Sequence, residues 1–390
     1  MKAIIIGGGI GGLASALALE RVGIHCDVFE QADDLREVGS GLTVFANAVR
    51  MLKQLGVAER LLPLGSAVDR FAILRSDGAT LSNSSYWELE RKLGVPVLTV
   101  VHRQDLLREL ASLVRKRRTH CGARCVAIEN KLDAVVARFA DGREASADLL
   151  VGADGLHSVV RAHLHGSSRP RYAGYTCWRG VALLELRDWP ADLSFESWGP
   201  GARFSIHHCG PGRLFWYGTH NVPEGGVDSA AGRKADVLNV FHSWHSPIPQ
   251  VIEATDEILR NDIVDRLPIR HWGVGRVTLL GDAAHPTTPN LGQGAGLALE
   301  DAVCLAAALA DRAEIGPALR QYERSRRRRT AAITRASWRI GSFCQWENAC
   351  ARSVRDTLTR CLPAQLGLRW LESIVNYEST KLPQPSHPTG

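Results

Sequence analysis

A glycine-rich turn between an apolar run and a periodic apolar segment constrains the start of this chain. Residues 2–6 are rich in β-branched side chains and end at glycines, which is typical of a buried parallel strand. Between residues 10 and 18, apolar side chains recur with helical spacing, and residues 26–30 form a second apolar run. The order of strand, glycine turn, helix and strand predicts a βαβ unit of about thirty residues.

The same turn has the spacing of a dinucleotide site. Gly7, Gly9 and Gly12 form a GxGxxG pattern, and Glu30 ends the second strand. The first glycine allows the tight turn, the second lets the backbone approach a pyrophosphate, and the third lets the helix lie close to the strand. The helix N-terminus favours the negative phosphates, and the Glu30 carboxylate is placed to accept hydrogen bonds from ribose hydroxyls. Because that carboxylate would repel a 2′-phosphate, the site suits FAD or NAD rather than NADP.

Two later segments lead to the same kind of site. Residues 149–153 form a buried strand that leads to Asp154, and residues 276–280 form another that leads to Asp282. The second aspartate can bond a polyol such as the ribityl chain of FAD. The loop after it enters the N-terminus of a long helix, whose free amides stabilise negative charge on an adjoining ring. A chain that returns three times to one cofactor is what a long, two-ended ligand such as FAD requires.

The chain changes character between residues 171 and 269. Aromatic residues concentrate there, and glycines and prolines are frequent, so we expect an antiparallel β-rich domain with one helix near residues 234–245. The expected fold is therefore α/β: a Rossmann-like FAD-binding domain with an inserted antiparallel β-sheet substrate domain and C-terminal helices. The expected boundaries are 1–72, 99–170 and 272–340 for the FAD-binding domain, 73–98 and 171–271 for the substrate domain, and 341–380 for the C-terminal helical segment.

The bulk composition excludes several classes of protein. With 45% hydrophobic and 23% charged residues, the chain resembles an ordinary globular protein, and a net charge of +6 does not indicate nucleic-acid binding. The first strand starts almost at Met1, which argues against a signal peptide, and no apolar run is long enough to cross a bilayer. The nine cysteines have neither redox nor zinc spacing. We therefore expect a cytoplasmic protein with reduced thiols and no stable membrane insertion.

Several conspicuous side chains receive a structural interpretation. The basic run Arg326–Arg329 would spread around a helix, which favours a solvated face. His242 and His245 share a helix face, but no further ligands lie nearby, so no metal site is expected. His285 is expected to be a buried structural histidine, although a proton relay remains an alternative.

With these motifs the chain resembles a known family, the FAD-dependent aromatic-ring hydroxylases. These are single-component flavoprotein monooxygenases such as p-hydroxybenzoate hydroxylase. The matching segments are the glycine motif with Glu30, Arg103, residues 151–155 and residues 280–286. The resemblance covers about residues 1–335. Residues 172–175 and the overall length look most like the branch that contains FAD-dependent urate hydroxylase, salicylate hydroxylase and zeaxanthin epoxidase.

The resemblance implies an activity. In this family NADH or NADPH reduces FAD, the reduced flavin reacts with O2 to give a C4a-hydroperoxide, and its distal oxygen passes to an electron-rich ring. The expected partners are therefore NAD(P)H, O2 and an aromatic or heteroaromatic small molecule, with the chain as a monomer or homodimer. The alternative is an epoxidase or another flavin oxidoreductase that acts on a lipophilic or isoprenoid substrate.

The resemblance also carries over roles at the matching positions. Asp154 would support the pyrophosphate region and NAD(P)H use, Asp282 would hold the ribityl chain, and Pro289 would shape the face that reacts with oxygen. Backbone amides of Leu291, Gly292, Gln293, Gly294 and Ala295 would meet the isoalloxazine. The remaining expected cofactor residues are Gly7, Gly9, Gly11, Gly12, Glu30, Gln31, Thr43, Arg103 and Cys125.

The expectation for the substrate rests on fewer residues. Arg203 matches an arginine that binds urate in the urate hydroxylases, and with Pro289 and Asn290 it forms the expected catalytic group. Phe215 stands where those enzymes have tyrosine, and Asn290 where they have aspartate. We therefore expect an aromatic or heteroaromatic substrate other than urate. A solvated strand position for Arg203 remains open.

Overall fold

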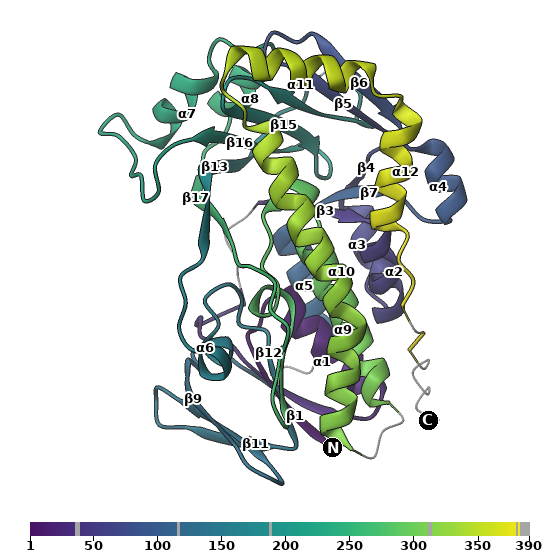
Figure 1. Ribbon diagram of the computed structural model, residues 1–390, viewed down its shortest axis with the longest axis vertical. Helices are drawn as coiled ribbons and strands as arrows, with labels where there is room; N and C mark the ends of the chain where they lie inside the picture. Colours follow the sequence, from purple (N-terminus) through teal and green to yellow (C-terminus); the bar gives the residue numbers. More distant parts are fainter. Residues whose placement is uncertain (36–39, 115–117, 187–188, 311–313, 380, 383–390) are drawn as a thin grey trace.

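The computed structural model describes residues 1–35, 40–114, 118–186, 189–310, 314–379 and 381–382. A five-stranded sheet lies in the lower half of the molecule and a seven-stranded sheet in the upper half (Figure 1). The long helix α10 (Ile315–Cys344) runs beside both halves. The fold is thus α/β with C-terminal helices, as the sequence predicted. The upper sheet contains one parallel pair of strands, so it is mixed and not wholly antiparallel as expected.

The lower sheet brings the three sequence motifs together. Its order is β18 (Val277–Leu279), β12 (Leu149–Gly152), β1 (Lys2–Ile6), β2 (His25–Phe29) and β8 (Thr119–His120), and all pairs are parallel. Ile6 pairs with Gly152, and Gly152 pairs with Leu279. Because these strands end in register, the turns that follow them meet at one edge of the sheet.

Helix α1 (Ile10–Arg21) packs tightly behind this edge. Its residues Leu13, Ala14 and Ala18 are fully buried, and it contacts α9 (Gly294–Leu309). A Cβ on Gly12 would lie 1.9 Å from the carbonyl oxygen of Gly7, so this position requires glycine for the helix to approach its own strand.

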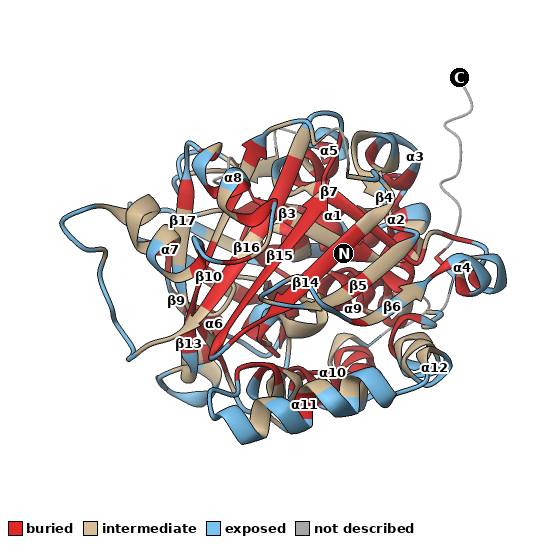
Figure 2. Ribbon diagram, turned by 90° about the horizontal axis from the view of Figure 1, so that it is seen from above, coloured by how far each residue is buried: buried red, intermediate tan, exposed pale blue. Residues whose placement is uncertain are grey.

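The upper sheet combines two distant parts of the sequence. Its order is β17 (Ile258–Asp265), β13 (Arg171–Leu183), β16 (Arg213–Asn221), β15 (Ala202–His208), β14 (Leu193–Trp198), β5 (Arg70–Arg75) and β6 (Thr80–Ser85). Strand β5 pairs with β14 in parallel, and the other pairs are antiparallel. Helices α7 (Arg233–Phe241) and α8 (Ile248–Glu253) cover one face through a core that contains Phe204, Trp216 and Phe241. Figure 2 shows these central strands as largely buried.

Smaller elements complete the structure. Two three-stranded sheets consist of β3 (Gly41–Phe45), β7 (Leu98–His102) and β4 (Ser66–Ala67), and of β9 (Cys125–Asn130), β10 (Val135–Phe139) and β11 (Glu144–Ala147). The other α-helices are α2 (Ala46–Leu55), α3 (Ala58–Leu61), α4 (Trp87–Leu93), α5 (Arg103–Leu113), α6 (Val159–His165), α11 (Ala349–Cys361) and α12 (Ala364–Val375). Helices α4 and α8 are too short for a periodic pattern, so sequence analysis did not identify them.

The interpretation of the basic run was wrong for two of its members. Arg326 is fully buried, and its guanidinium pairs with Glu300 and Asp301 at 2.6 and 2.7 Å. Arg329 also pairs with Glu300, at 2.7 Å. The reason is that α10 packs this face against α9, which presents the two carboxylates. Arg328 is exposed, as the pattern predicted.

Among the described residues, no helix combines the length and the apolar character needed to cross a membrane.

Candidate functional site

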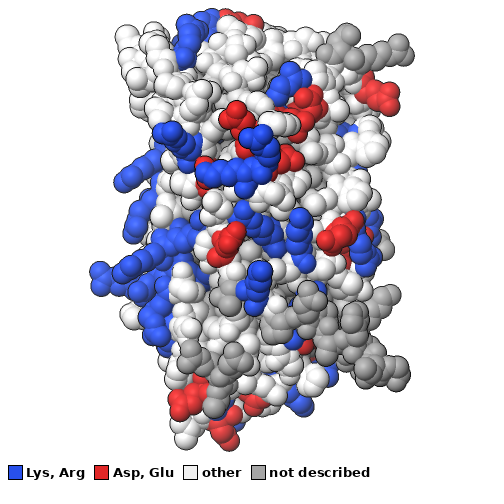
Figure 3. Space-filling model, turned by 90° about the vertical axis from the view of Figure 1, so that its right-hand side faces the viewer, with Lys and Arg blue, Asp and Glu red and all other residues white. Residues whose placement is uncertain are grey.

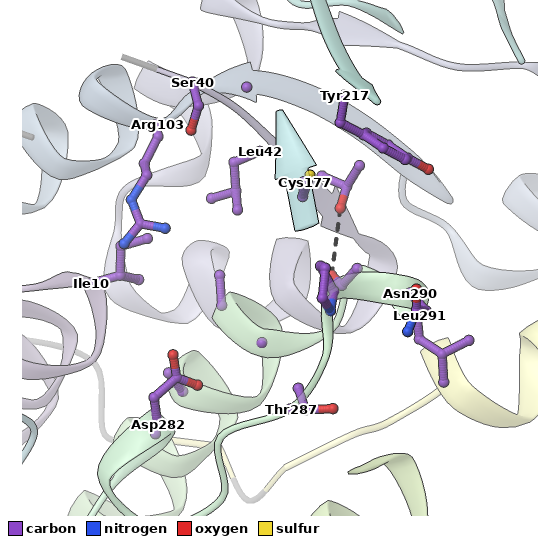
Figure 4. Close-up of a pocket in the computed structure, with 18 of the residues that line it drawn as sticks. Ile10, Ser40, Leu42, Arg103, Cys177, Tyr217, Asp282, Thr287, Asn290 and Leu291 are labelled. Atoms are coloured by element: carbon purple, nitrogen blue, oxygen red, sulfur yellow. Dashed lines mark hydrogen bonds between the residues drawn. The ribbon is translucent and has the colours of Figure 1, made fainter. Parts of the chain in front are cut away.

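A cavity of about 1210 Å³ extends from the edge of the lower sheet to the upper sheet. The turns after β1, β12 and β18 line one end, and strands β14, β15 and β16 line the other. In Figure 4, Asp282, Thr287, Asn290 and Leu291 approach this space from one side, and Tyr217 lies across from them. The site is therefore a single continuous space with a wall from each sheet.

The dinucleotide end of the cavity has the features that a phosphate requires. The N-cap residue of helix α1 is Gly9, which provides no side-chain cap, so the first N–H groups of the helix are left for a ligand. A Cβ on Gly9 would meet nothing within 4 Å, which leaves open space beside the backbone. The Glu30 carboxylate accepts hydrogen bonds from the amides of Gly8 and Ala32, at 2.6 and 2.9 Å. Arg103, at the start of α5, lines the same space (Figure 4). This set of donors and acceptors fits the adenosine and pyrophosphate part of FAD.

Asp282 supplies a carboxylate midway along the cavity. It follows β18 in a 3₁₀ turn, Gly281–Ala283, and its side chain faces the cavity (Figure 4). The Asp282 side chain is exposed to the cavity, but the protein around the cavity reduces its solvation, which raises the pKa of Asp282, and His285 and Arg103 partly offset that effect. A ligand hydroxyl that donates to this carboxylate would replace the lost solvation, as the ribityl chain of FAD does.

The loop between Asp282 and α9 is held from behind. Asp301 accepts hydrogen bonds from the Gly281 amide at 3.0 Å and from His285 at 2.6 Å. The hydroxyl of Ser337, on α10, donates to the carbonyl of Thr288 at 2.6 Å. His285 is thus a buried structural residue at this loop, as expected. The loop then ends in an uncapped helix N-terminus at α9, which is suited to an electron-rich ring edge.

A buried polar cluster forms the substrate end of the cavity. Arg203 on β15 is 2% exposed, so the solvated alternative for it is wrong. Its guanidinium donates to Gln345 at 2.9 Å and to Asn290 at 2.7 Å, and lies 3.5 Å from Glu196 on β14. Burial alone would lower the pKa of Arg203, but the Glu196 carboxylate reverses this effect and holds the guanidinium charged. Tyr217 on β16 donates its hydroxyl to the same carboxylate.

Most of the sequence-predicted residues line this cavity. They are Gly7, Gly9, Gly11, Glu30, Gln31, Thr43, Arg103, Cys125, Asp154, Arg203, Asp282, Pro289, Asn290, Leu291, Gly292, Gly294 and Ala295. Gly12 lies behind the turn. Gln293 is buried away from the cavity, and its side chain accepts a hydrogen bond from Asn47 at 3.0 Å.

Asp154 has a structural function that the sequence did not indicate. Its carboxylate accepts hydrogen bonds from the Ser158 hydroxyl and the Val159 amide, at 2.5 and 2.7 Å, and so holds the start of α6. Burial nevertheless raises the pKa of this carboxyl above its usual value, and the hydrogen bonds oppose that change.

Two groups of cavity residues were not among those predicted from the sequence. Glu196 and Tyr217 meet because β14 and β16 both flank β15, an order that the sequence does not reveal. The one sequence feature that could have indicated this cluster is the charged residue Glu196 between the aromatic residues Phe195 and Trp198. The second group comes from α11 and α12, whose leucines also line the cavity.

Comparisons with known proteins agree with this geometry. The FAD binding domain family model matches residues 1–213 and 241–337. The aurachin C monooxygenase/isomerase of Stigmatella aurantiaca is 43% identical over 364 residues, which covers 93% of this chain and 94% of that protein. The chloroplastic zeaxanthin epoxidase of Nicotiana plumbaginifolia is 37% identical, over 85% of this chain and 53% of its own length.

A solved structure of Klebsiella pneumoniae HpxO, in complex with FAD and uric acid, superimposes with a TM-score of 0.89. It is 32% identical and covers 96% of each chain. The expected cofactor, FAD, and the expected oxidoreductase activity are thereby confirmed. The chain belongs to the FAD binding domain family and is an FAD-dependent monooxygenase of the aromatic-ring hydroxylase group.

Proposed function

We propose that this protein uses NAD(P)H and O2 to hydroxylate a neutral aromatic or heteroaromatic ring bound beside Arg203 and Asn290. The continuity of the cavity carries this proposal, because the uncapped N-terminus of α1 and the Arg203 cluster open into the same space. A ring held at one end can therefore lie against a flavin held along the other. The related monooxygenases support the reaction class.

The roles of the residues follow from their places. When bound, FAD supplies the two-electron and oxygen chemistry, while the chain binds, orients and shields. The amides at α1 and Asp282 would hold the pyrophosphate and ribityl parts. The backbone after Asn290 would meet the ring edge at the α9 N-terminus. Apolar residues such as Phe343 and Trp198 exclude water from the ring.

The charge of the substrate pocket favours a neutral ring. Glu196 already neutralises Arg203, and both ions are buried. An aromatic carboxylate would have to separate this ion pair or lie against the Glu196 carboxylate. In a buried site either arrangement costs roughly several kcal/mol of binding free energy. A phenolic hydroxyl or a ring amide can instead hydrogen-bond to the existing cluster.

Spectroscopy and product analysis test the proposal. The purified protein should be yellow or take up FAD, and a neutral hydroxylated or nitrogen-containing ring should perturb the flavin spectrum and accelerate NAD(P)H oxidation. Isotopically labelled O2 should place one labelled oxygen on the product ring. A protein that cannot be reconstituted with FAD would overturn the proposal, and so would tighter binding of benzoates than of the matched phenols.

Epoxidation of a lipophilic alkene is the second candidate. The apolar residues of α11 and α12 that line the cavity favour it, as does the likeness to zeaxanthin epoxidase. The same isotope experiment distinguishes hydroxylation from epoxidation. In an epoxide the labelled oxygen bridges two saturated carbons, and the double bond of the substrate is lost.

A further inference from the structure

A row of apolar side chains on α11 and α12 lines the cavity and is also half exposed. Leu358, Leu362, Leu366 and Trp370 are 57%, 54%, 50% and 45% exposed. Leu358 lies on α11, Leu362 is the extended C-cap residue of α11, and Leu366 and Trp370 are four residues apart on one face of α12. The same cavity is also lined by the apolar residues Ile73, Ile340 and Phe343. We call the part of the cavity that is lined by these two sets of residues the apolar groove.

The two helices are firmly anchored, so the exposure of this row is a property of the fold. Arg355 on α11 is 1% exposed in its side chain, donates to the carbonyl of Cys344 at 2.9 Å and lies over the Trp198 ring. On α12, the carbonyl of Ile374 accepts a hydrogen bond from Arg329 at 2.7 Å, and Glu372 pairs with Lys92. These anchors hold both helices in place along the groove.

The groove offers almost no hydrogen bonding. Among the described cavity residues of α11 and α12, the side chains that can hydrogen-bond are Thr359, whose hydroxyl donates to the carbonyl of Arg355 at 2.9 Å, and Trp370, through its indole N–H. Helix α12 lies on the side of the molecule shown in Figure 3, where uncharged surface is interspersed with Lys, Arg, Asp and Glu. An occupant of the groove therefore needs hydrocarbon, not polar groups.

The cavity is thus polar at one end and apolar at the other. Arg203, Glu196 and Asn290 can satisfy a polar ring, while the groove leads away from them to the surface. Contiguous exposed apolar surface on a globular protein commonly marks a binding site. Because the groove is continuous with the cavity, a single molecule can place its ring in the polar end and its remaining atoms in the groove. The continuity therefore favours the substrate itself as the occupant of the groove.

We propose that the substrate carries a linear hydrocarbon tail that lies in the apolar groove, with its ring at Arg203 and Asn290. This inference rests on the proposed function, since it extends the substrate of the same site. Because the leucines and Trp370 of the groove are half exposed, one side of the tail would stay open to solvent.

A series of para-alkylphenols tests the tail separately from the ring. The FAD-loaded protein is titrated with methyl, pentyl and nonyl members below their aggregation limits, and the flavin spectrum gives Kd. Each methylene that enters the groove should tighten binding by about threefold to fourfold. A Kd that does not depend on chain length, or no binding by any member, overturns the tail proposal. In both cases the proposed function stands if a short heteroaromatic ring still perturbs the flavin and is hydroxylated.

Matched variants locate the tail. Leu362→Asn and Leu366→Asn should reduce the preference for nonyl over methyl by about tenfold and leave the affinity for the methyl compound unchanged. Val354→Asn is the control, because Val354 lies on α11 with the same 54% exposure but does not line the cavity. If Leu362→Asn and Val354→Asn behave alike, the groove is not the tail site.

A larger apolar side chain in the groove tests the proposal without making the groove more polar. A Cβ on Gly367, in α12, would meet nothing within 4 Å, so Gly367→Leu fits the helix and raises its propensity. It should weaken nonylphenol binding selectively while the melting temperature holds or rises. A second copy of the chain is the competing occupant of the groove, and light scattering on Leu362→Asn tests for it. If the parent protein is a dimer and this variant is a monomer, the groove is an interface between copies and the proposal is overturned.

Discussion

The side-chain amide of Asn290 connects the loop before α9 to Arg203 on the upper sheet. Its oxygen accepts hydrogen bonds from Arg203 at 2.7 Å and from Tyr175 at 3.0 Å. Its nitrogen donates to the Thr288 hydroxyl and to the Ser337 carbonyl, both at 2.9 Å. All four bonds run to different residues, so the amide fixes the substrate cluster relative to the loop.

Replacing Asn290 by Ala should separate ring binding from cofactor binding. The substitution leaves the Arg203 guanidinium with one partner fewer in a buried site, so Kd for the ring should rise by about tenfold. The FAD affinity should change little, because the side chain points away from the dinucleotide end. Fluorescence titration gives the FAD affinity. The release of hydrogen peroxide measures the fraction of NAD(P)H oxidation that no longer leads to hydroxylated product. Equal loss of both affinities would contradict this role.

Two glycines of the first motif should respond differently to alanine. Gly9→Ala meets no atom within 4 Å, so the stability of the apoprotein should not change, yet the added methyl occupies the approach to the pyrophosphate. FAD binding should weaken by about tenfold or more. Gly12→Ala would place a methyl 1.9 Å from a carbonyl oxygen and should destabilise the apoprotein by about 1–3 kcal/mol or more. Thermal unfolding without FAD distinguishes the two.

Asp282→Asn should have opposite effects on the apoprotein and on cofactor binding. The raised pKa of Asp282 means that the folded state binds a proton more tightly than the unfolded state, so the ionised carboxylate costs stability as the pH rises above the ordinary aspartate value. The amide removes that cost, and the melting temperature of the apoprotein at neutral pH should rise. FAD affinity should fall, because a neutral acceptor bonds hydroxyls less strongly. A variant that binds FAD as tightly as the parent would exclude a carboxylate contact.

His207 should make the protein sensitive to acid. Burial lowers its pKa from 6.5 to about 3, and the nearby His208 adds to this effect. The folded state therefore excludes a proton that the unfolded state takes up below pH 6.5, so stability falls as the pH drops from 6.5 toward 3. In urea unfolding, His207→Asn should reduce the slope of unfolding free energy against pH by as much as about 1.4 kcal/mol per unit. An unchanged slope would show that His207 is not buried as a neutral side chain.

The basic run on α10 should divide into structural and solvated members. Arg326→Met removes one of the two arginines that face the buried carboxylates Glu300 and Asp301, so one negative charge loses its compensation, which should cost about 3–5 kcal/mol of unfolding free energy. Arg328→Met, two residues later on the exposed face, should change stability by less than about 0.5 kcal/mol. Chemical denaturation of the two variants under the same conditions measures the difference.

The sequence predicted the parts of the site that depend on strand ends. Gly7, Asp154 and Asp282 each follow a buried strand, and parallel pairing in register brings such residues together. The Glu196–Arg203 pair was not predictable, since it depends on which strands of the upper sheet are neighbours. Arg326 was misread for a similar reason: a helix has no solvated face until its packing partner is known. The contacts assigned to individual cofactor residues stay predictions.

The attachment of the loop before α9 has a consequence for how such a site can diversify. Asp301 holds Gly281 and His285, and Ser337 holds Thr288, so helices α9 and α10 determine the loop's path. Strands β14 and β16 contribute nothing to those particular contacts. Residues such as Glu196 and Tyr217 can therefore be exchanged, and new specificities selected, while the oxygen-handling part of the molecule keeps its shape.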